Sequence, residues 1–268
     1  MATTDARKDR TGTQAIQRCA ALLRLITTYN RTGMRLVDLH NSANLTRPTA
    51  HRLLQALVAE GFVRQDDRSK RYFLGSLTYE MGVAAAAPYT YDLRDTCVPY
   101  LRQVADATGD TVFLTVRSGL DGVCIARAEG AFPIKVFVLD VGRRRPLNVG
   151  AGATALLSAL PDDEIQRICL ANKERTERGY PRFSWDDLRQ RIARAREQGY
   201  LENEVLEVES VRSIAVPILD PHGRPIGAVS ISALSSRLKG PALADKVKNL
   251  QSAVHAIEEK LRIHATDD

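Results

Sequence analysis

The first part of the chain places apolar residues three or four positions apart, which is the spacing of one-sided helices. Residues 13–29 follow this pattern up to a break at residues 31–33, and residues 35–43 follow it again over a shorter stretch. A third pattern begins after Thr46, whose side chain can cap a helix. It carries Pro48 in its first turn, where the missing N–H costs nothing. Three short helices are therefore predicted.

Two short runs of β-forming residues follow the third helix. Residues 62–64 and 71–74 flank a polar turn, and so they predict a β-hairpin that ends at Gly75. Three helices and a basic hairpin in this order are typical of a winged helix-turn-helix, whose third helix enters the major groove of DNA. An Ala-rich helical stretch then continues to Pro88, and we predict that it connects two domains.

The rest of the chain mixes helical patterns with β-rich runs. Helices are predicted over 91–108 and 151–160, after Pro161 and Ser184, and over 243–261. The predicted strands are 111–117, 123–128, 134–139, 213–219 and 226–234, the last two joined by the turn sequence Asp220-Pro221-His222-Gly223. This order predicts an α+β domain in which helices flank an antiparallel sheet.

The chain is predicted to divide into a winged helix-turn-helix domain (1–75), a linker helix (76–90) and a second domain (91–268), and the first of these carries the excess positive charge. The formal net charge of the chain is +6. Residues 1–75 hold 13 Lys and Arg against 6 Asp and Glu, whereas the remaining 193 residues hold 25 against 26. A basic domain beside a near-neutral one indicates that the first binds a polyanion and the second does not. The alternative is a basic surface that only meets solvent.

Hydropathy and cysteine spacing restrict the class of protein further. No stretch reaches the roughly 18 consecutive apolar residues that span a bilayer, and residues 1–10 lack a secretory pattern. We therefore expect a cytoplasmic protein with no membrane partner. The cysteines form no CxxC pair and are expected to be small buried side chains, so we predict no metal and no cofactor. They are Cys19, Cys97, Cys124 and Cys169.

Short runs in both domains occur in an order and spacing that are specific to one protein family. In the first domain they are residues 45–54, Leu57, 61–63 and 72–75. In the second domain they are residues 146–147, 151–157, 199–200, Glu204, 213–218, Gly223 and 227–232. With these runs the chain resembles the IclR family of bacterial transcriptional regulators over almost its whole length.

The resemblance implies a GAF-like effector-binding domain, assembly into dimers or tetramers, and allosteric control of transcription by a small metabolite. Family effectors are often organic acids or aromatic catabolic intermediates. The chain departs from the common pattern at Asn148, Thr154 and Ser213, where His, Lys and Cys are frequent. These positions lie near the expected pocket, so the ligand of an individual family member is not carried over.

Candidate DNA contacts cluster at the start of the third helix and in the hairpin turn. They are Thr46, Arg47, Thr49, His51, Arg52, Arg68, Lys70 and Arg71. Arg52 lies about 140° around the helix from Arg47, which favours a phosphate or an acidic partner inside the domain over a base edge. The hairpin residues suit the minor groove or the DNA backbone. For each charged side chain the alternative is a solvated surface position.

The candidate effector pocket lies between the helix that starts near Ala151 and the strands 213–219 and 226–234. The first backbone N–H groups of this helix are free to bind an anion. Ser230 and Ser232 alternate in an apolar strand and so point to one face, which is either a pocket wall or a polar surface stripe. The candidate effector contacts are Ala151, Gly152, Asn203, Ser213, Ser230 and Ser232. A small carboxylate fits this set better than a cation or a nucleotide. Residues 143–145, all arginine, could also recognise an anion, but three consecutive arginines point in different directions, which favours their interpretation as solvated.

Two other classes of protein fit the sequence less well than a regulator does. An enzyme is disfavoured because the five histidines are scattered and the sequence has no HExxH, GxSxG or Walker motif. An architectural DNA-binding protein would not need so large a second domain. We therefore predict a transcriptional regulator, not an enzyme, that binds a double-stranded operator, a small-molecule effector and further copies of itself. Self-association is predicted in the connector, at Leu77, Met81 and residues 84–87. The apolar stripe of residues 243–261 is the alternative interface, although such a stripe usually packs on the sheet of an α+β domain.

Overall fold

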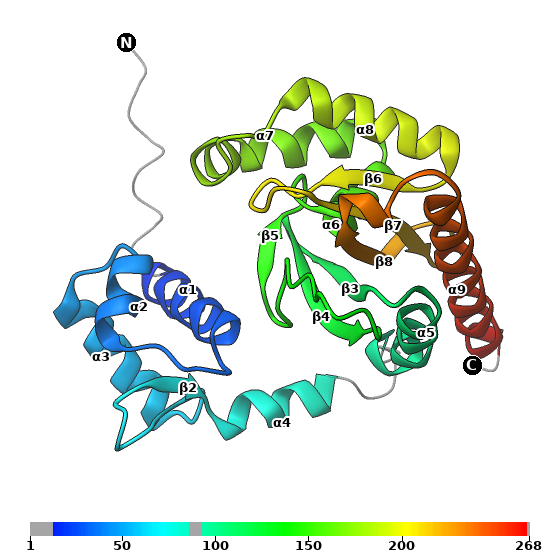
Figure 1. Cartoon of the computed structure of the whole chain (residues 1–268). Coiled ribbons are helices and arrows are strands. Elements are labelled where there is room, and N and C mark those ends of the chain that lie inside the picture. Colours follow the sequence, from blue (N-terminus) through cyan, green and yellow to red (C-terminus); the bar gives the residue numbers. More distant parts are fainter. Residues whose placement is uncertain (1–12, 86–92, 267–268) are drawn as a thin grey trace, which may run out of the picture. The chain divides into compact units, whose positions relative to one another are not determined.

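The computed structural model describes residues 13–85 and 93–266, which divide into two compact units, one on each side of residues 86–92 (Figure 1). The predicted helices and hairpin of the first unit are confirmed, and the helical pattern after Gly75 is confirmed as far as Ala85. The rest of that stretch, with Pro88, lies outside the described residues. The elements are α1 (Gln14–Thr28), α2 (Leu36–Ser42), α3 (Arg47–Ala59), β1 (Val63–Gln65), β2 (Tyr72–Leu74) and α4 (Ser76–Ala85).

One apolar cluster holds the first unit together. Leu22 and Ile26 of α1, Leu54 and Leu57 of α3, and Tyr72 of β2 belong to it and are buried. Burial of apolar surface stabilises the folded state by roughly 25 cal/mol per Å². Because α3 contributes to this cluster, its apolar face is held against the rest of the unit. The opposite face of α3 is left to solvent.

The second unit is built on a six-stranded sheet in which every neighbouring pair of strands is antiparallel. The strand order is β5-β4-β3-β8-β7-β6, which brings β3 beside β8 although they are far apart in sequence. The strands are β3 (Thr111–Ser118), β4 (Asp121–Glu129), β5 (Arg144–Pro146), β6 (Leu201–Glu204), β7 (Val211–Leu219) and β8 (Pro225–Leu234). The helices are α5 (Leu93–Thr108), α6 (Ala151–Ser158), α7 (Asp162–Gly179), α8 (Trp185–Gln198) and α9 (Gly240–Thr266), with a short 3-10 turn, η1 (Ser235–Arg237), before α9.

Helices cover both faces of this sheet (Figure 1). α5 and α9 pack on one face in a cluster that contains Ile214 and Val216 of β7 and Val229 and Ile231 of β8. α6, α7 and α8 contribute to a second cluster, which includes Ala215 and Ala228 from the other face of the same strands. Because side chains alternate along a strand, the serines between these apolar positions face α6.

The sheet differs from the prediction in one strand that is absent and in two, β5 and β6, that were not predicted. Residues 134–139, predicted as a strand, have no regular secondary structure, and β5 forms the edge of the sheet instead. Val136 is buried in a small cluster with Val205 and Val211, so the alternating apolar residues cover a neighbouring segment and do not pair with a strand. β6 was not predicted because it has only four residues, of which three are polar.

The described residues contain neither a membrane-spanning helix nor a group of metal-ligating side chains. None of their helices is both long and apolar enough to cross a bilayer. No three His, Cys, Asp or Glu side chains among them are placed to hold a metal ion. Cys97 and Cys124 are buried as predicted, whereas Cys19 and Cys169 are half-buried, and all four are free thiols.

Candidate functional site

The first turns of α3 present the predicted polar residues to solvent. Thr46 caps the helix, because its Oγ1 accepts a hydrogen bond from the Thr49 N–H at 3.4 Å and its hydroxyl donates to Thr49 Oγ1 at 2.8 Å. Arg47, His51 and Arg52 are exposed, and Thr49 is half-buried. This set combines hydroxyl, imidazole and guanidinium groups at the end of the helix that a helix-turn-helix inserts into the major groove.

The hairpin turn is organised by Asp66. Its Oδ1 accepts hydrogen bonds from the Ser69 N–H at 2.7 Å and from the Ser69 hydroxyl at 2.6 Å, and these bonds lower the pKa of Asp66. Arg68 and Lys70 are exposed on this turn. Lys70 has a φ of +56° and forms a long ion pair with Asp67, at 3.9 Å. Both cations therefore extend from a tightly bonded turn into solvent.

Two other arginines of the hairpin are tied to the fold. Arg71, a predicted DNA contact, is half-buried and donates from Nη1 to the Gly33 carbonyl at 2.8 Å, so it braces the hairpin against the turn before α2. Arg64, which sequence reasoning missed, is exposed and places its guanidinium 4.5 Å from the centre of the Phe73 ring. Side chains alternate between the two faces of a strand, so the apolar Val63 beside it was the signal that could have placed Arg64 on the exposed face.

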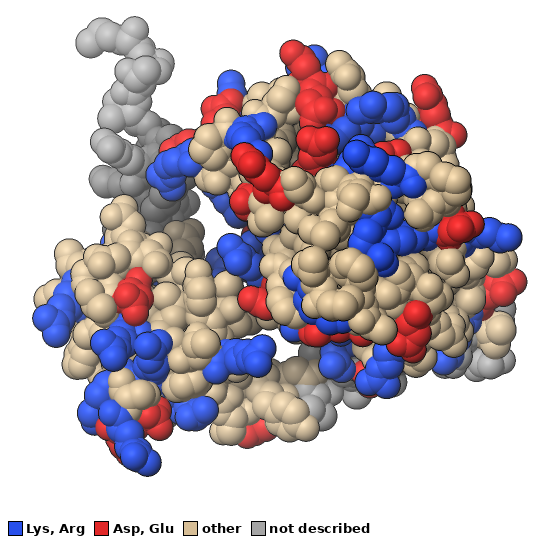
Figure 2. Space-filling model, in the orientation of Figure 1, with Lys and Arg blue, Asp and Glu red and all other residues tan. Residues whose placement is uncertain are grey.

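The charge of the first unit is mainly positive. Residues 13–75 hold 10 Lys and Arg against 4 Asp and Glu. Figure 2, in the orientation of Figure 1, shows most of the visible basic side chains of this unit around α3 and the hairpin, with few acidic side chains between them. Such a surface attracts phosphates, and the attraction falls with ionic strength because bound phosphates release counterions.

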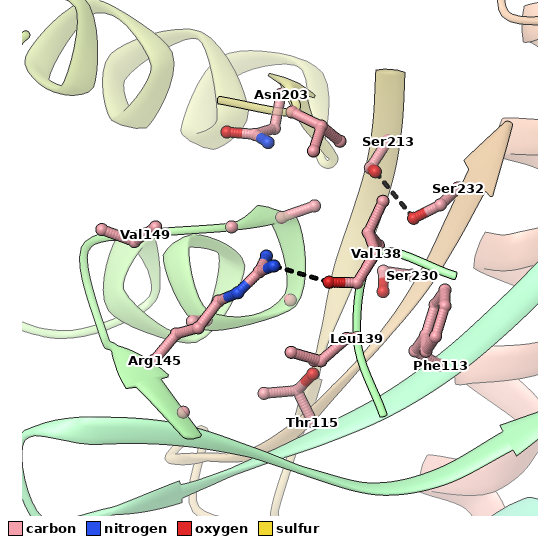
Figure 3. A pocket seen from close by; sticks show the side chains of 16 residues that line it. Phe113, Thr115, Val138, Leu139, Arg145, Val149, Asn203, Ser213, Ser230 and Ser232 are labelled. Carbon is pink, nitrogen blue, oxygen red and sulfur yellow. Dashed lines mark hydrogen bonds between the residues drawn. The ribbon is translucent and has the colours of Figure 1, made fainter. Parts of the chain in front are cut away.

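In the second unit, all six predicted effector contacts line one pocket, between the start of α6 and the sheet (Figure 3). The serines come from β7 and β8, and Asn203 comes from β6. The cavity has a volume of about 30 Å³, which is room for about one water molecule. The other lining residues include Phe113, Thr115, Val138, Leu139, Arg145, Val149 and Val205.

The polar side chains of the pocket are held in place to different degrees. The hydroxyls of Ser213 and Ser232 share a hydrogen bond of 2.7 Å. The Asn203 side chain accepts a hydrogen bond from Arg191 of α8 and donates from Nδ2 to the Glu204 carbonyl at 2.9 Å. Its amide is thus oriented from outside the pocket, while Ser230 is 5% exposed and lines the pocket wall.

The start of α6 lies unusually close to the sheet because of Gly152. A Cβ at this position would lie 2.6 Å from Thr115 Oγ1, a distance that real Cβ atoms essentially never show. Gly150, the N-cap residue, has a φ of +84° and no side chain to cap the helix. The first backbone N–H groups of α6 therefore have no capping side chain, and since Ala151 and Gly152 line the pocket, the helix dipole favours an anion there.

Arg145 is the pocket residue that the sequence analysis misjudged. Its side chain is only 9% exposed, and its Nη2 donates to the Val138 carbonyl at 2.5 Å and contacts Glu207 Oε1 at 2.8 Å. The interpretation of residues 143–145 as solvated is thus wrong for Arg145. Arg144, on the other face of β5, pairs with Asp121 through Nε at 3.2 Å. The edge pairing of β5 with β4 decides which arginine points inward, and this pairing was not predicted.

Comparisons with known proteins cover both units. A family model described as the IclR helix-turn-helix domain matches residues 15–67, and one described as the bacterial transcriptional regulator IclR C-terminal matches residues 86–259. The HTH-type transcriptional regulator XynR of Escherichia coli K12 is 28% identical over 248 residues. These residues cover 92% of this chain and 97% of that protein.

Solved structures share the fold at lower identity. An IclR transcriptional regulator from Silicibacter sp. TM1040 has a TM-score of 0.75 at 21% identity, with 92% of this chain and 96% of that chain covered. An IclR homolog from Microbacterium hydrocarbonoxydans, crystallised in complex with 4-hydroxybenzoate, has a TM-score of 0.72 at 20% identity, with 93% and 99% covered. At these identities the likeness concerns the fold alone.

Proposed function

Because this chain belongs to the IclR family of bacterial transcriptional regulators, we propose that an organic or aromatic acid, bound in the pocket beside α6, controls its affinity for operator DNA. The observation that carries this proposal is the pocket itself. It joins the uncapped start of a helix, three serines and a buried guanidinium in one small space. Each of these groups donates hydrogen bonds, and together they favour a carboxylate.

The proposed DNA-binding surface consists of the exposed start of α3 and the hairpin turn. Arg47, His51 and Arg52 are exposed on α3, and Arg68 and Lys70 are exposed on the turn, in a unit of net positive charge. Helix residues near the N-terminus supply base contacts in this architecture, and wing residues supply backbone or minor-groove contacts. Arg71 serves the fold through its bond to Gly33, and its contact with DNA would be secondary.

The proposed ligand is a small acid that requires the pocket to open. A cavity of about 30 Å³ does not admit an organic acid, so at least one wall has to move. Val138 and Leu139 belong to a wall segment without regular secondary structure. The complex of the Microbacterium hydrocarbonoxydans homolog with 4-hydroxybenzoate supports the choice of an aromatic acid as the first compound to test.

We also expect the chain to act as a dimer or larger assembly. One winged helix-turn-helix buries too little surface for high specificity, so two have to bind together. On α4, Tyr79 and Met81 leave 76% and 52% of their surface exposed. Large apolar side chains on a solvent-exposed helix favour a contact between copies. Light scattering that shows a monomer at micromolar concentration would refute this part of the proposal.

Selection of binding sites from random duplex DNA, followed by mobility-shift titration at fixed salt, tests the DNA-binding proposal. The Arg47→Ala and Arg52→Ala variants should weaken binding of the selected duplex by about 1–3 kcal/mol where the side chain makes a strong contact. Arg189→Ala is a matched control, since Arg189 is an exposed arginine of the second unit. Wild-type affinity in both helix variants would sink the assignment of α3 as the recognition helix.

A further inference from the structure

The pocket contains one ionisable side chain among its described lining residues, Arg145. Its Nε atom is buried and has no hydrogen-bond partner in the described part of the chain. A guanidinium binds a carboxylate best through two parallel N–H···O bonds, and an unused Nε leaves half of such a fork available. The buried arginine therefore presents an incompletely occupied carboxylate site.

In this structure the Arg145 guanidinium contacts a carboxylate of the protein itself, that of Glu207. Glu207 Oε1 lies 2.8 Å from Arg145 Nη2, and its side chain is 36% exposed, so it reaches in from the surface. Glu207 lies between β6 and β7, two residues after Val205, which lines the pocket. An acid of the protein itself thus occupies the position next to the unused Nε.

Arg145 also binds the second segment that covers the pocket. Its Nη2 donates to the Val138 carbonyl, and Val138 lines the pocket from the irregular segment 134–139 (Figure 3). This segment packs against the first through Val136 and Val205, which share an apolar cluster. One guanidinium therefore contacts two neighbouring segments, and a ligand that takes over the guanidinium removes this shared contact. Arg182 holds the start of the second segment independently, through the carbonyls of Val205 and Leu206.

We infer that Glu207 is an internal competitor, whose carboxylate occupies Arg145 until the carboxylate of an effector acid replaces it. This inference rests on the effector pocket proposed above and adds the residue that selects the ligand. The incoming acid takes Nη2 and the unused Nε, Glu207 turns out to solvent, and the segments 134–139 and 205–210 lose the contact with Arg145 that they share. The pocket accordingly selects a carboxylate over a neutral analogue of the same shape.

Acetate and acetamide, titrated into the full-length protein at constant ionic strength, test this inference. The readout is the ¹⁵N signal of Arg145 Nε, assigned by its loss in Arg145→Met. Glu207→Gln keeps the volume of the side chain and removes the competing charge. The variant protein should bind acetate about tenfold more tightly than wild type, because acetate no longer has to break a charge-assisted contact. Acetamide should leave the signal unchanged in both proteins.

Glu209→Gln is the matched control, because Glu209 is an exposed acid of the same segment and its loss changes the net charge equally. The control should bind acetate as wild type does. Equal effects of the two glutamine variants, or no effect of either, would overturn the inference. If Arg145→Met does not fold, the conservative variant Arg145→Lys supplies the assignment of the Nε signal. Release of the operator by an aromatic acid, with equal potency in wild type and Glu207→Gln, would leave effector control intact and reject only the competitor role.

Discussion

The hydroxyl groups of Ser213 on β7 and Ser232 on β8 lie 2.7 Å apart and share a hydrogen bond at the wall of the pocket. Both residues are 2% exposed. A buried hydroxyl that loses its partner bears the full cost of its desolvation, whereas removal of both hydroxyls is close to neutral. This pair therefore fixes the two hydroxyl groups relative to each other on the face of the sheet that lines the pocket.

Removal of one member of this pair should destabilise the second unit more than removal of both. Ser213→Ala and Ser232→Ala should each lower the free energy of unfolding by about 1–3 kcal/mol, and the double variant should lower it by less than either single variant. Urea denaturation followed by the fluorescence of Trp185 measures this, because the chain has one tryptophan and it lies in the second unit. Strictly additive losses would show that the hydroxyls do not depend on each other.

Gly152→Ala should destabilise the second unit, because the new Cβ would lie 2.6 Å from Thr115 Oγ1 and 2.9 Å from Thr115 Cβ. Overpacking of this kind costs about 1–3 kcal/mol. Gly179→Ala, at the end of α7, is the control: a Cβ there meets nothing within 4 Å, and its effect should stay within about 0.5 kcal/mol. The same urea titration compares the two, and equal stability of both variants would show that α6 is free to shift.

The lowered pKa of Asp66 predicts how the hairpin turn responds to acid. Hydrogen bonds from Ser69 lower the pKa of this carboxyl below its ordinary value of 3.8. A lowered folded-state pKa means that the stabilisation is complete above the ordinary value and is lost as the pH falls through the lowered one. An NMR titration of Asp66 should show this midpoint, and Ser69→Ala should raise it. A midpoint at or above 3.8 in the wild-type protein would contradict the hydrogen-bonded turn.

The cysteines should differ in their rate of alkylation. Burial raises the pKa of Cys97 and of Cys124 to about 12, so at about pH 8 almost none of either thiol is the reactive thiolate. Cys19 and Cys169 are half-buried and should react first with iodoacetamide, as followed by peptide mass spectrometry. Faster labelling of Cys97 or Cys124 would indicate that the second unit opens readily.

Much of the fold and part of the pocket could be predicted from the sequence, because local patterns determine them. Thr46 and Pro48 mark the start of α3, and alternation in β8 places Ser230 and Ser232 on one face. Arg145 could not be selected, since three consecutive arginines are equivalent in sequence and only the pairing of β5 with β4 distinguishes them. Non-local pairing of this kind is invisible to periodicity.

The segment 134–139 shows the opposite error. Its apolar residues alternate as in a strand, yet Val136 is buried against Val205 and Val211, and Val138 and Leu139 line the pocket. Period-2 alternation predicts only that every second side chain is buried, and a loop that covers a cavity satisfies the same condition. The residues that close the pocket were therefore predicted as part of the sheet beneath it.

The most direct test of effector control is the operator affinity measured with and without an acid that binds the protein, in wild type and in Ser230→Val. Val adds volume at the pocket wall and suits a strand, so this variant should keep its operator affinity and lose its response to the acid. Fluorescence anisotropy of a labelled operator should show a change of about 5–150-fold on addition of the acid to wild type, the usual range of allosteric coupling. An acid that shifts the operator affinity of Ser230→Val as much as that of wild type would contradict the assignment of this pocket as the effector site.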